Sequence, residues 1–137
     1  MRVARDDGAI TPVRKHGTDA GLDIAALEDA IIPAHGYTTI RTGVHVELPP
    51  GTAGVLMSRS GLNLHHGVTT TGLIDEGFTG EIVVSAHNDG DEDVHVRHGD
   101  RITQLTIIPV LYEDVRVVDS LNAGERGTDG YGSTGLS

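Results

Sequence analysis

An all-β fold, either a sandwich or a barrel of short strands, is what this 137-residue sequence predicts. Apolar and polar residues alternate in most of its regular segments, which is the pattern of strands with one buried face. Turn signals separate these segments at short intervals, as in PPG at 49–51, NDGDED at 88–93 and HGD at 98–100. Many short strands with frequent turns are typical of sandwiches and barrels.

The clearest strand pattern lies at 38–48, TTIRTGVHVEL, where every second residue is apolar or small. Its expected inward face consists of Ile40, Val44, Val46 and Leu48. Four further segments read as strands: EIVVSAH at 81–87, VHVR at 94–97, VRVV at 115–118, and RITQLTIIPV, a buried strand ending near Pro109. The core must consist of Val, Ile, Leu and Ala, because the chain has only three tyrosines and one phenylalanine.

The segment IAALEDAII at 24–32 is ambiguous on local grounds. Its residues favour a helix that would stop at Pro33. Nine residues are marginal for a helix, however, and a strand is equally compatible with the pattern. The residues alone leave both alternatives open.

Composition limits the classes of function. The formal net charge of −10 argues against a nucleic-acid partner, and the absence of cysteine excludes disulfides, zinc–thiolate sites and thiol nucleophiles. The chain has no 18-residue apolar run and no signal-peptide core, so we expect a cytoplasmic protein without membrane contact. The eight histidines show no H-E-x-x-H spacing and favour solvated or turn positions over a metal site.

The end of the chain loses the apolar rhythm of the rest. RGTDGYGSTG at 126–135 spells G-x-G-x-x-G, but without the strand and helix that normally flank a phosphate-binding loop. We therefore predict a β-barrel catalytic domain at 1–119 and a flexible C-terminal arm at 120–137, which orders only against another surface.

The arm nevertheless carries groups suited to a phosphorylated aromatic ligand. Its glycines let backbone N–H groups approach oxygens closely, and Arg126 offers a charged fork. Ser133 and Thr134 add hydroxyl donors, and Tyr131 adds a ring face. Composition alone favours the alternative, a disordered Gly/Ser tail without a ligand.

Two internal segments place polar groups beside apolar runs. SRSG at 58–61 presents a guanidinium, a hydroxyl and accessible backbone N–H groups, which suits phosphate or a plain turn. In GLIDEGFTGEI at 72–82, Asp75 follows an apolar pair and precedes Phe78. A carboxylate held in this way can act as a general base toward water, although a structural turn aspartate is the alternative.

Together with DAGLDIAA at 19–26 and GDRITQL at 99–105, these segments resemble, in order, the five motifs of the homotrimeric dUTP diphosphatases (dUTPases). The resemblance extends from about residue 12 to the C-terminus. It implies a distorted β-barrel of jelly-roll type, with a strand rather than a helix after the first motif. It also implies a homotrimer with active sites between subunits, over which the arm closes as a lid.

The resemblance further implies hydrolysis of dUTP to dUMP and diphosphate, with Mg²⁺ bridging the phosphates. Asp75 would activate the water that attacks the α-phosphorus, and Asp23 would help hold the closed assembly or the water shell of the metal. Uracil would lie in a turn pocket near 69–75. The implied substrate-binding residues are Arg59, Ser60, Gly61, Thr69, Gly72, Ile74, Phe78, Gln104, Arg126, Tyr131, Gly132, Ser133 and Thr134.

Several departures from the motifs bear on selectivity. Phe78 stands where the family usually has tyrosine, and it keeps the ring that packs on deoxyribose and blocks a 2′-hydroxyl. Thr69 stands where many members have asparagine near the base, and Tyr131 replaces the commoner phenylalanine.

Three alternative functions remain at the level of the sequence. The related dCTP deaminases need a catalytic glutamate where this chain has Ser85. A non-catalytic nucleotide sensor would gain nothing from the carboxylate of Asp75. A structural, capsid-like jelly roll would not need five chemical motifs in order.

Overall fold

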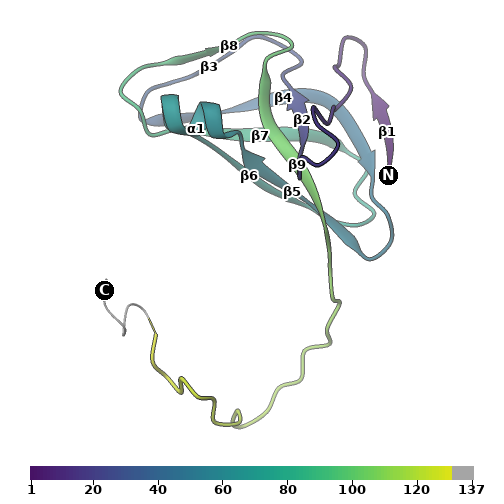
Figure 1. The fold of residues 1–137 in the computed structure, drawn as a ribbon, viewed down its shortest axis with the longest axis vertical. Helices are drawn as coiled ribbons and strands as arrows, with labels where there is room; N and C mark the ends of the chain where they lie inside the picture. Colours follow the sequence, from purple (N-terminus) through teal and green to yellow (C-terminus); the bar gives the residue numbers. More distant parts are fainter. Residues whose placement is uncertain (131–137) are drawn as a thin grey trace.

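The computed structural model describes residues 1–130 and is built mainly from strands (Figure 1). Seven strands form one antiparallel sheet in the order β1-β4-β7-β6-β5-β9-β2, and β3 pairs with β8 in a second sheet. The large sheet curls into a half-barrel, which confirms the predicted all-β class. The elements are β1 (Arg2–Arg5), β2 (Leu22–Ala25), β3 (Ala30–Ile32), β4 (Gly36–Glu47), β5 (Thr52–Ser58), α1 (Ser60–His66), β6 (Val68–Ile74), β7 (Glu81–Asn88), β8 (Val94–Val96) and β9 (Arg101–Pro109).

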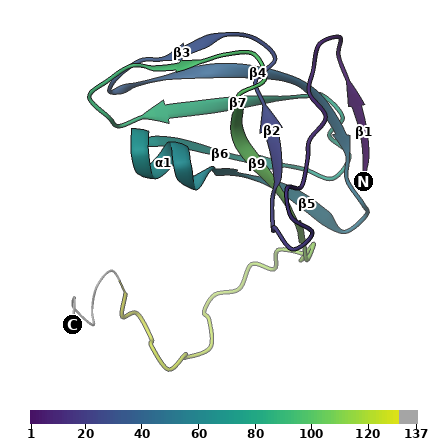
Figure 2. The same ribbon diagram turned by 45° about the horizontal axis from the view of Figure 1, so that its top comes forward.

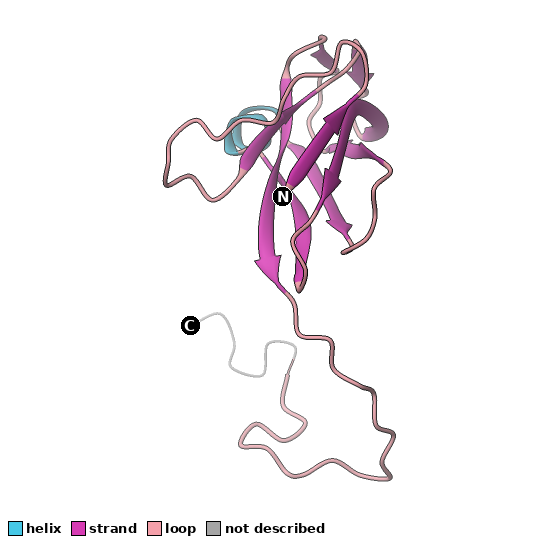
Figure 3. Ribbon diagram, turned by 90° about the vertical axis from the view of Figure 1, so that its right-hand side faces the viewer, coloured by secondary structure: helices cyan, strands magenta, loops and turns pink. Residues whose placement is uncertain are grey.

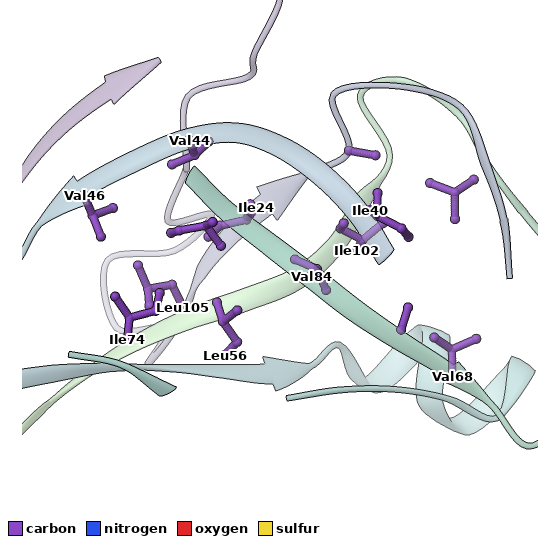
Figure 4. Packing of buried hydrophobic residues seen from close by; sticks show 14 of the residues in the cluster. Ile24, Ile40, Val44, Val46, Leu56, Val68, Ile74, Val84, Ile102 and Leu105 are labelled. Carbon is purple, nitrogen blue, oxygen red and sulfur yellow. The ribbon is translucent and has the colours of Figure 1, made fainter. Parts of the chain in front are cut away.

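One apolar core fills the inside of the curl (Figure 4). The alternation in β4 and β7 directs Ile40, Val44 and Val84 inward, where each is at most 1% exposed. β9 contributes Ile102 and Leu105 to the same cluster. Burying a side chain of this size stabilises the fold by about 1.5–3 kcal/mol. The pattern that predicted the strands therefore also supplies the core.

The ambiguous segment at 24–32 is strand on both sides of a turn. Ile24 lies in β2 and Ile32 in β3, and both are fully buried. Asn88 at the end of β7 ties the small sheet to the large one, because its amide donates to the carbonyl oxygen of Ile32 at 3.1 Å. Tertiary packing therefore decides between the two local alternatives in favour of strands.

The helix α1 was not expected, since the sequence around 58–67 reads as turns. It follows β5 directly, and Gly67 ends it in a left-handed conformation with φ of 68°. The Gly67 N–H donates to the carbonyl oxygen of Asn63 at 2.9 Å. His65 and His66 therefore lie in the last turn of a helix. This helix is too short to cross a membrane, and residues 1–130 contain no other.

The chain leaves the barrel after β9 (Figure 3). Residues 110–130 contain neither helix nor strand, and the predicted strand at 115–118 is wrong. Val115 and Val117 are 94% and 91% exposed, because no neighbouring strand in residues 1–130 covers them. A β-branched segment forms a strand only where a partner supplies the hydrogen bonds of its ladder. The division into parts at 119 and 120 stays a prediction.

Candidate functional site

Asp23 lies between two arginines at the end of the barrel where β5 leads into α1. Its Oδ1 accepts from Arg59 Nε at 3.1 Å and its Oδ2 from Arg101 Nη1 at 3.0 Å. Arg59 also donates to the carbonyl oxygen of Arg101 at 3.0 Å. The Asp23 side chain is 16% exposed, whereas those of Arg59 and Arg101 are 28% and 42% exposed. The carboxylate therefore anchors both guanidinium groups while leaving part of each open to solvent.

Strand register brings these distant residues together. β9 pairs with β2 on one side and with β5 on the other (Figure 2). Gln104 lies opposite Asp23 in β2 and opposite Met57 in β5. The Gln104 amide donates to the carbonyl oxygen of Ser58 at 3.0 Å, which directs this side chain toward Arg59. Three of the five sequence motifs thus meet on three neighbouring strands.

A hollow of about 190 Å³ opens beside this cluster. Its lining is mostly polar, and it includes four residues that the sequence analysis did not assign to the site, namely Lys15, His16, Asp19 and Arg101. The full lining is Lys15, His16, Asp19, Asp23, Arg59, Ser60, Arg101 and Gln104. Cationic side chains, a hydroxyl and an amide around one hollow suit a phosphate group. The sequence could have singled out Lys15 as a candidate site residue, since it is the only lysine of the chain.

Asp19 closes one side of the hollow. The backbone N–H of His16 donates to its carboxylate at 2.8 Å, and the His16 ring lies 3.1 Å from the same oxygen. The N–H contact lowers the pKa of the Asp19 carboxyl. Asp19 thereby stays ionised and holds the loop that carries Lys15.

Gly21 makes room for Gln104. A β-carbon at residue 21 would lie 2.6 Å from Gln104 Oε1 and 2.9 Å from its Cβ. We expect Gly21→Ala to displace the Gln104 side chain. For the nucleotide that the sequence resemblance implies, KM should rise about ten-fold, because one positioned hydrogen bond is worth about 1–1.5 kcal/mol. Steady-state kinetics would measure this, with Gly17→Ala as the control, since no atom lies within 4 Å of a β-carbon there. Equal KM for both variants would contradict the role of Gly21.

The residues predicted to read the base lie on one strand, so the turn predicted near 69–75 is wrong, while the base pocket itself stays a prediction. Thr69, Gly72 and Ile74 all belong to β6. The amide of Asn63 in α1 donates to Thr69 Oγ1 at 3.2 Å. Ile74 is only 6% exposed, so its side chain packs in the core and only its backbone can reach a ligand.

The turn from 75 to 80 carries Asp75 and Phe78. The N–H of Phe78 donates to the carbonyl oxygen of Asp75 at 3.1 Å, and Gly77 adopts a φ of 87°. Asp75 is exposed at the surface, and Phe78 is 47% exposed. One turn therefore exposes both a carboxylate and an aromatic ring to solvent.

Asp75 does not meet Arg59 within one chain. Ile74 pairs with Gly54 near the start of β5, whereas Arg59 follows the end of that strand. A strand rises about 3.3 Å per residue, which places Asp75 about 20 Å from Arg59 along the β5–β6 pair. The turn from 75 to 80 and the hollow thus lie at opposite ends of these strands.

The predicted residues of the arm are not placed in the site. Arg126 lies in the exposed segment beyond β9. Tyr131, Gly132, Ser133 and Thr134 lie outside the described residues. In residues 1–130, no group of three or more His, Cys, Asp or Glu side chains is arranged to hold a metal ion.

Comparisons with known proteins show which family the chain resembles over its length. The dUTPase family profile matches residues 7–135. A deoxyuridine 5′-triphosphate nucleotidohydrolase from Clostridium acetobutylicum is 44% identical, and the match covers 96% of this chain and 92% of that protein. The dUTPase of Staphylococcus bacteriophage 80alpha, solved with dUPNHPP, superimposes with a TM-score of 0.92 at 28% identity over 98% of both chains.

A second phage structure bears on the metal. A mutant dUTPase from phage phi11 of S. aureus, whose structure shows coordination of a structural Mg(II) ion, has a TM-score of 0.80 at 26% identity. That match covers 87% of this chain and 96% of the phage chain. The profile that spans almost the whole sequence and the full-length relatives lead to one conclusion, which the five motifs and the fold support: the chain belongs to the dUTPase family.

Proposed function

We propose that this dUTP nucleotidohydrolase cleaves dUTP to dUMP and diphosphate by in-line attack of a water that Asp75 activates. The water would attack the α-phosphorus, and the O–P bond to the leaving diphosphate would break as the new bond forms. Such a reaction depends on positioning and on stabilisation of charge more than on covalent chemistry. The exposed carboxylate of Asp75 and the hollow with its cationic side chains at Arg59 would supply these two requirements.

The observation that carries the proposal is the separation of these two parts in one chain. Asp75 lies about 20 Å from Arg59, a span far greater than the hydrogen-bond reach that a general base needs. A second copy can place its own Asp75 against the hollow of the first. We therefore propose a homotrimer in which each active site combines the hollow of one subunit with the turn from 75 to 80 of another.

The hollow would hold the phosphates. Arg59, Ser60 and Gly61 lie together at the start of α1, and Gln104 reaches the same place from β9. Asp23 keeps Arg59 in position. Each Asp23 oxygen accepts one arginine N–H and retains a second lone pair, so it can also accept from a metal-bound water.

The residues around the hollow fit Mg²⁺ that arrives with the nucleotide. Two carboxylates and several cations line it, which is too few acidic ligands for a protein cage but suits a hydrated ion bound to phosphates. The ion would neutralise phosphate charge in the transition state. Asp19 and Asp23 would bind its waters.

The remaining contacts would select the nucleoside. Backbone groups of Thr69, Gly72 and Ile74 on β6 would read uracil, and the Phe78 ring would pack on deoxyribose and exclude a 2′-hydroxyl.

The arm, residues 120–137, would close the site. Arg126, Gly132, Ser133 and Thr134 would bind the terminal phosphates, and Tyr131 would stack on the base. Since dUTP belongs to the nucleotide pool inside cells, we propose a cytoplasmic location.

Mixing two inactive variants would test the composite site. Asp75→Asn lacks the base, and Arg59→Ala lacks a phosphate contact, so each homotrimer should be nearly inactive. After denaturation and refolding together, random assortment should restore about a quarter of the sites. Mixing without refolding is the control. No recovery from chains that do co-assemble, as shown by a tag on one of them, would contradict the proposal of shared sites.

A further inference from the structure

The Phe78 ring is held by its own turn. A β-carbon at residue 80 would lie 2.6 Å from the ring Cζ and 2.9 Å from Cε2, so the ring rests directly on Gly80. Its position relative to a sugar therefore depends on the backbone of Thr79 and Gly80. Whatever holds this backbone also holds the ring.

His45 in β4 is the side chain that holds Thr79. Its Nδ1 lies 3.0 Å from the carbonyl oxygen of Thr79, and its Nε2 lies 3.2 Å from Asp6 Oδ1. Both partners are acceptors, so each ring nitrogen must carry a proton to bond to its partner. Only the imidazolium form of His45 can make both hydrogen bonds at once.

The charges around His45 favour this form. The Thr79 carbonyl, and after it the Asp6 carboxylate, raise the pKa of His45 above its ordinary value of 6.5 against the opposing effect of burial. Glu81 on β7 acts in the same direction. The other charged groups that line this end of the sheet are Arg2 and Arg5 on β1, with Arg41 and Glu47 on β4. Arg41 is itself paired with Glu81 and Asp6, and Arg2 with Glu47.

Deprotonation would leave His45 with a single N–H. A hydrogen bond to a carboxylate is stronger than one to a neutral carbonyl, so the remaining proton would stay on Nε2 toward Asp6. The lone pair of Nδ1 would then face the Thr79 oxygen, and that bond would be lost. Because the pKa is raised, the Thr79 bond is present at lower pH and is lost as the pH rises through the pKa of the folded protein.

We propose that His45 is a positioning residue for sugar selectivity, which holds the Phe78 ring through Thr79 and makes rejection of UTP weaken as the pH rises. The proposal rests on the role given above to Phe78 as the group that excludes a 2′-hydroxyl. In this role His45 would act through Thr79 and would not touch the substrate itself. Its effect therefore lies in the ratio of two substrates and not in the catalytic step that both share.

The experiment measures kcat/KM for dUTP and for UTP from pH 5.5 to 9 and follows their ratio. Both nucleotides carry the same triphosphate, so the titration of phosphates and catalytic groups cancels in this ratio. In the wild-type protein we expect the preference for dUTP to fall about ten-fold through a transition above pH 6.5, because the loss of one hydrogen bond changes such a ratio by about this factor. NMR of the His45 ring nitrogens should show two N–H groups below the same transition.

Three variants separate this role from a general structural one. His45→Gln can reach Asp6 but not Thr79, and should show the weaker preference at every pH. His45→Asn places an N–H where Nδ1 stood and should keep the strong preference without a transition. Asp6→Asn can donate to Nε2, which leaves the proton on Nδ1, and should also remove the transition while keeping the preference. His98→Gln is the control, since His98 contacts the carbonyl oxygen of Leu27 instead.

The outcomes distinguish a failure of the proposed role of Phe78 from a failure of the inference about His45. If the wild-type protein hydrolyses UTP as well as dUTP even at pH 5.5, the proposed role of Phe78 fails. If it prefers dUTP but the ratio does not change with pH, and His45→Gln leaves it unchanged, only the inference about His45 is overturned. A His45 ring that titrates at or below pH 6.5 would also overturn it.

Discussion

Replacing Asp75 with asparagine should lower kcat for dUTP about 10²- to 10⁴-fold, which is the range that one general base contributes. The amide keeps the size of the side chain but cannot take a proton from water. Asp75 is exposed in the turn after β6 and makes no side-chain hydrogen bond in residues 1–130, so its replacement should not disturb the fold. Pre-steady-state turnover measures the chemical step, and calorimetry with a non-hydrolysable dUTP analogue measures binding.

The expected pattern is a large loss of kcat with binding almost unchanged. Asp7→Asn is the matched control, because Asp7 is another exposed aspartate near a turn and has no place in the proposed site. Near-normal turnover in the Asp75 variant would remove this carboxylate from the mechanism. A loss of nucleotide affinity equal to the loss of kcat/KM would instead make Asp75 a binding residue.

Truncation after Ala123 should leave a folded protein with kcat/KM for dUTP lowered about a hundred-fold or more. The deleted residues include Arg126 and the Gly/Ser/Thr segment proposed to bind the terminal phosphates, and charge-assisted hydrogen bonds are worth about 1.5–3 kcal/mol each. The strands of the barrel end at Pro109, so the deletion removes no element of the sheet. The truncation should therefore remove activity, as measured by steady-state kinetics, and leave the Tm of thermal unfolding nearly unchanged.

A shorter deletion provides the control for this experiment. Truncation after Gly135 keeps RGTDGYGSTG intact and should retain activity. If the protein truncated after Ala123 turned over dUTP at the rate of the full chain, the arm would not be a lid. A large drop in Tm would show that residues 124–137 contribute to the fold, which the exposed course of residues 110–130 does not lead us to expect.

Much of the barrel could be predicted from the sequence because its strands have one buried face. The alternation of apolar and polar residues around Ile40 and Val84 indicates which side of β4 and β7 faces the core. This pattern can be read from a few neighbouring residues of the sequence. Two of the misreadings also have local causes. SGLNLHH is too short to show helical periodicity, and VRVV at 115–118 has the composition of a strand but no neighbour to pair with in residues 1–130.

Some residues of the candidate site could be predicted from the sequence, but the contacts between them could not. The order of the motifs predicted that Asp23, Arg59 and Gln104 belong to one site. Their contacts were not predictable, because Asp23 and Arg101 are 78 residues apart and meet only through the register of β2 on β9. The hydrogen bond between His45 in β4 and Thr79 in the turn before β7 likewise joins residues that are 34 apart in the sequence.

The sequence by itself determined the all-β class, the buried face of β4 and the chemical groups available, since these follow from residue types and their spacing along the chain. Only the tertiary structure decided which groups meet. It placed Asp23 between Arg59 and Arg101, and it put Asp75 at the far end of the β5–β6 pair. The physical reason is that the register between strands depends on packing the whole core at once, and no short stretch of sequence contains that information.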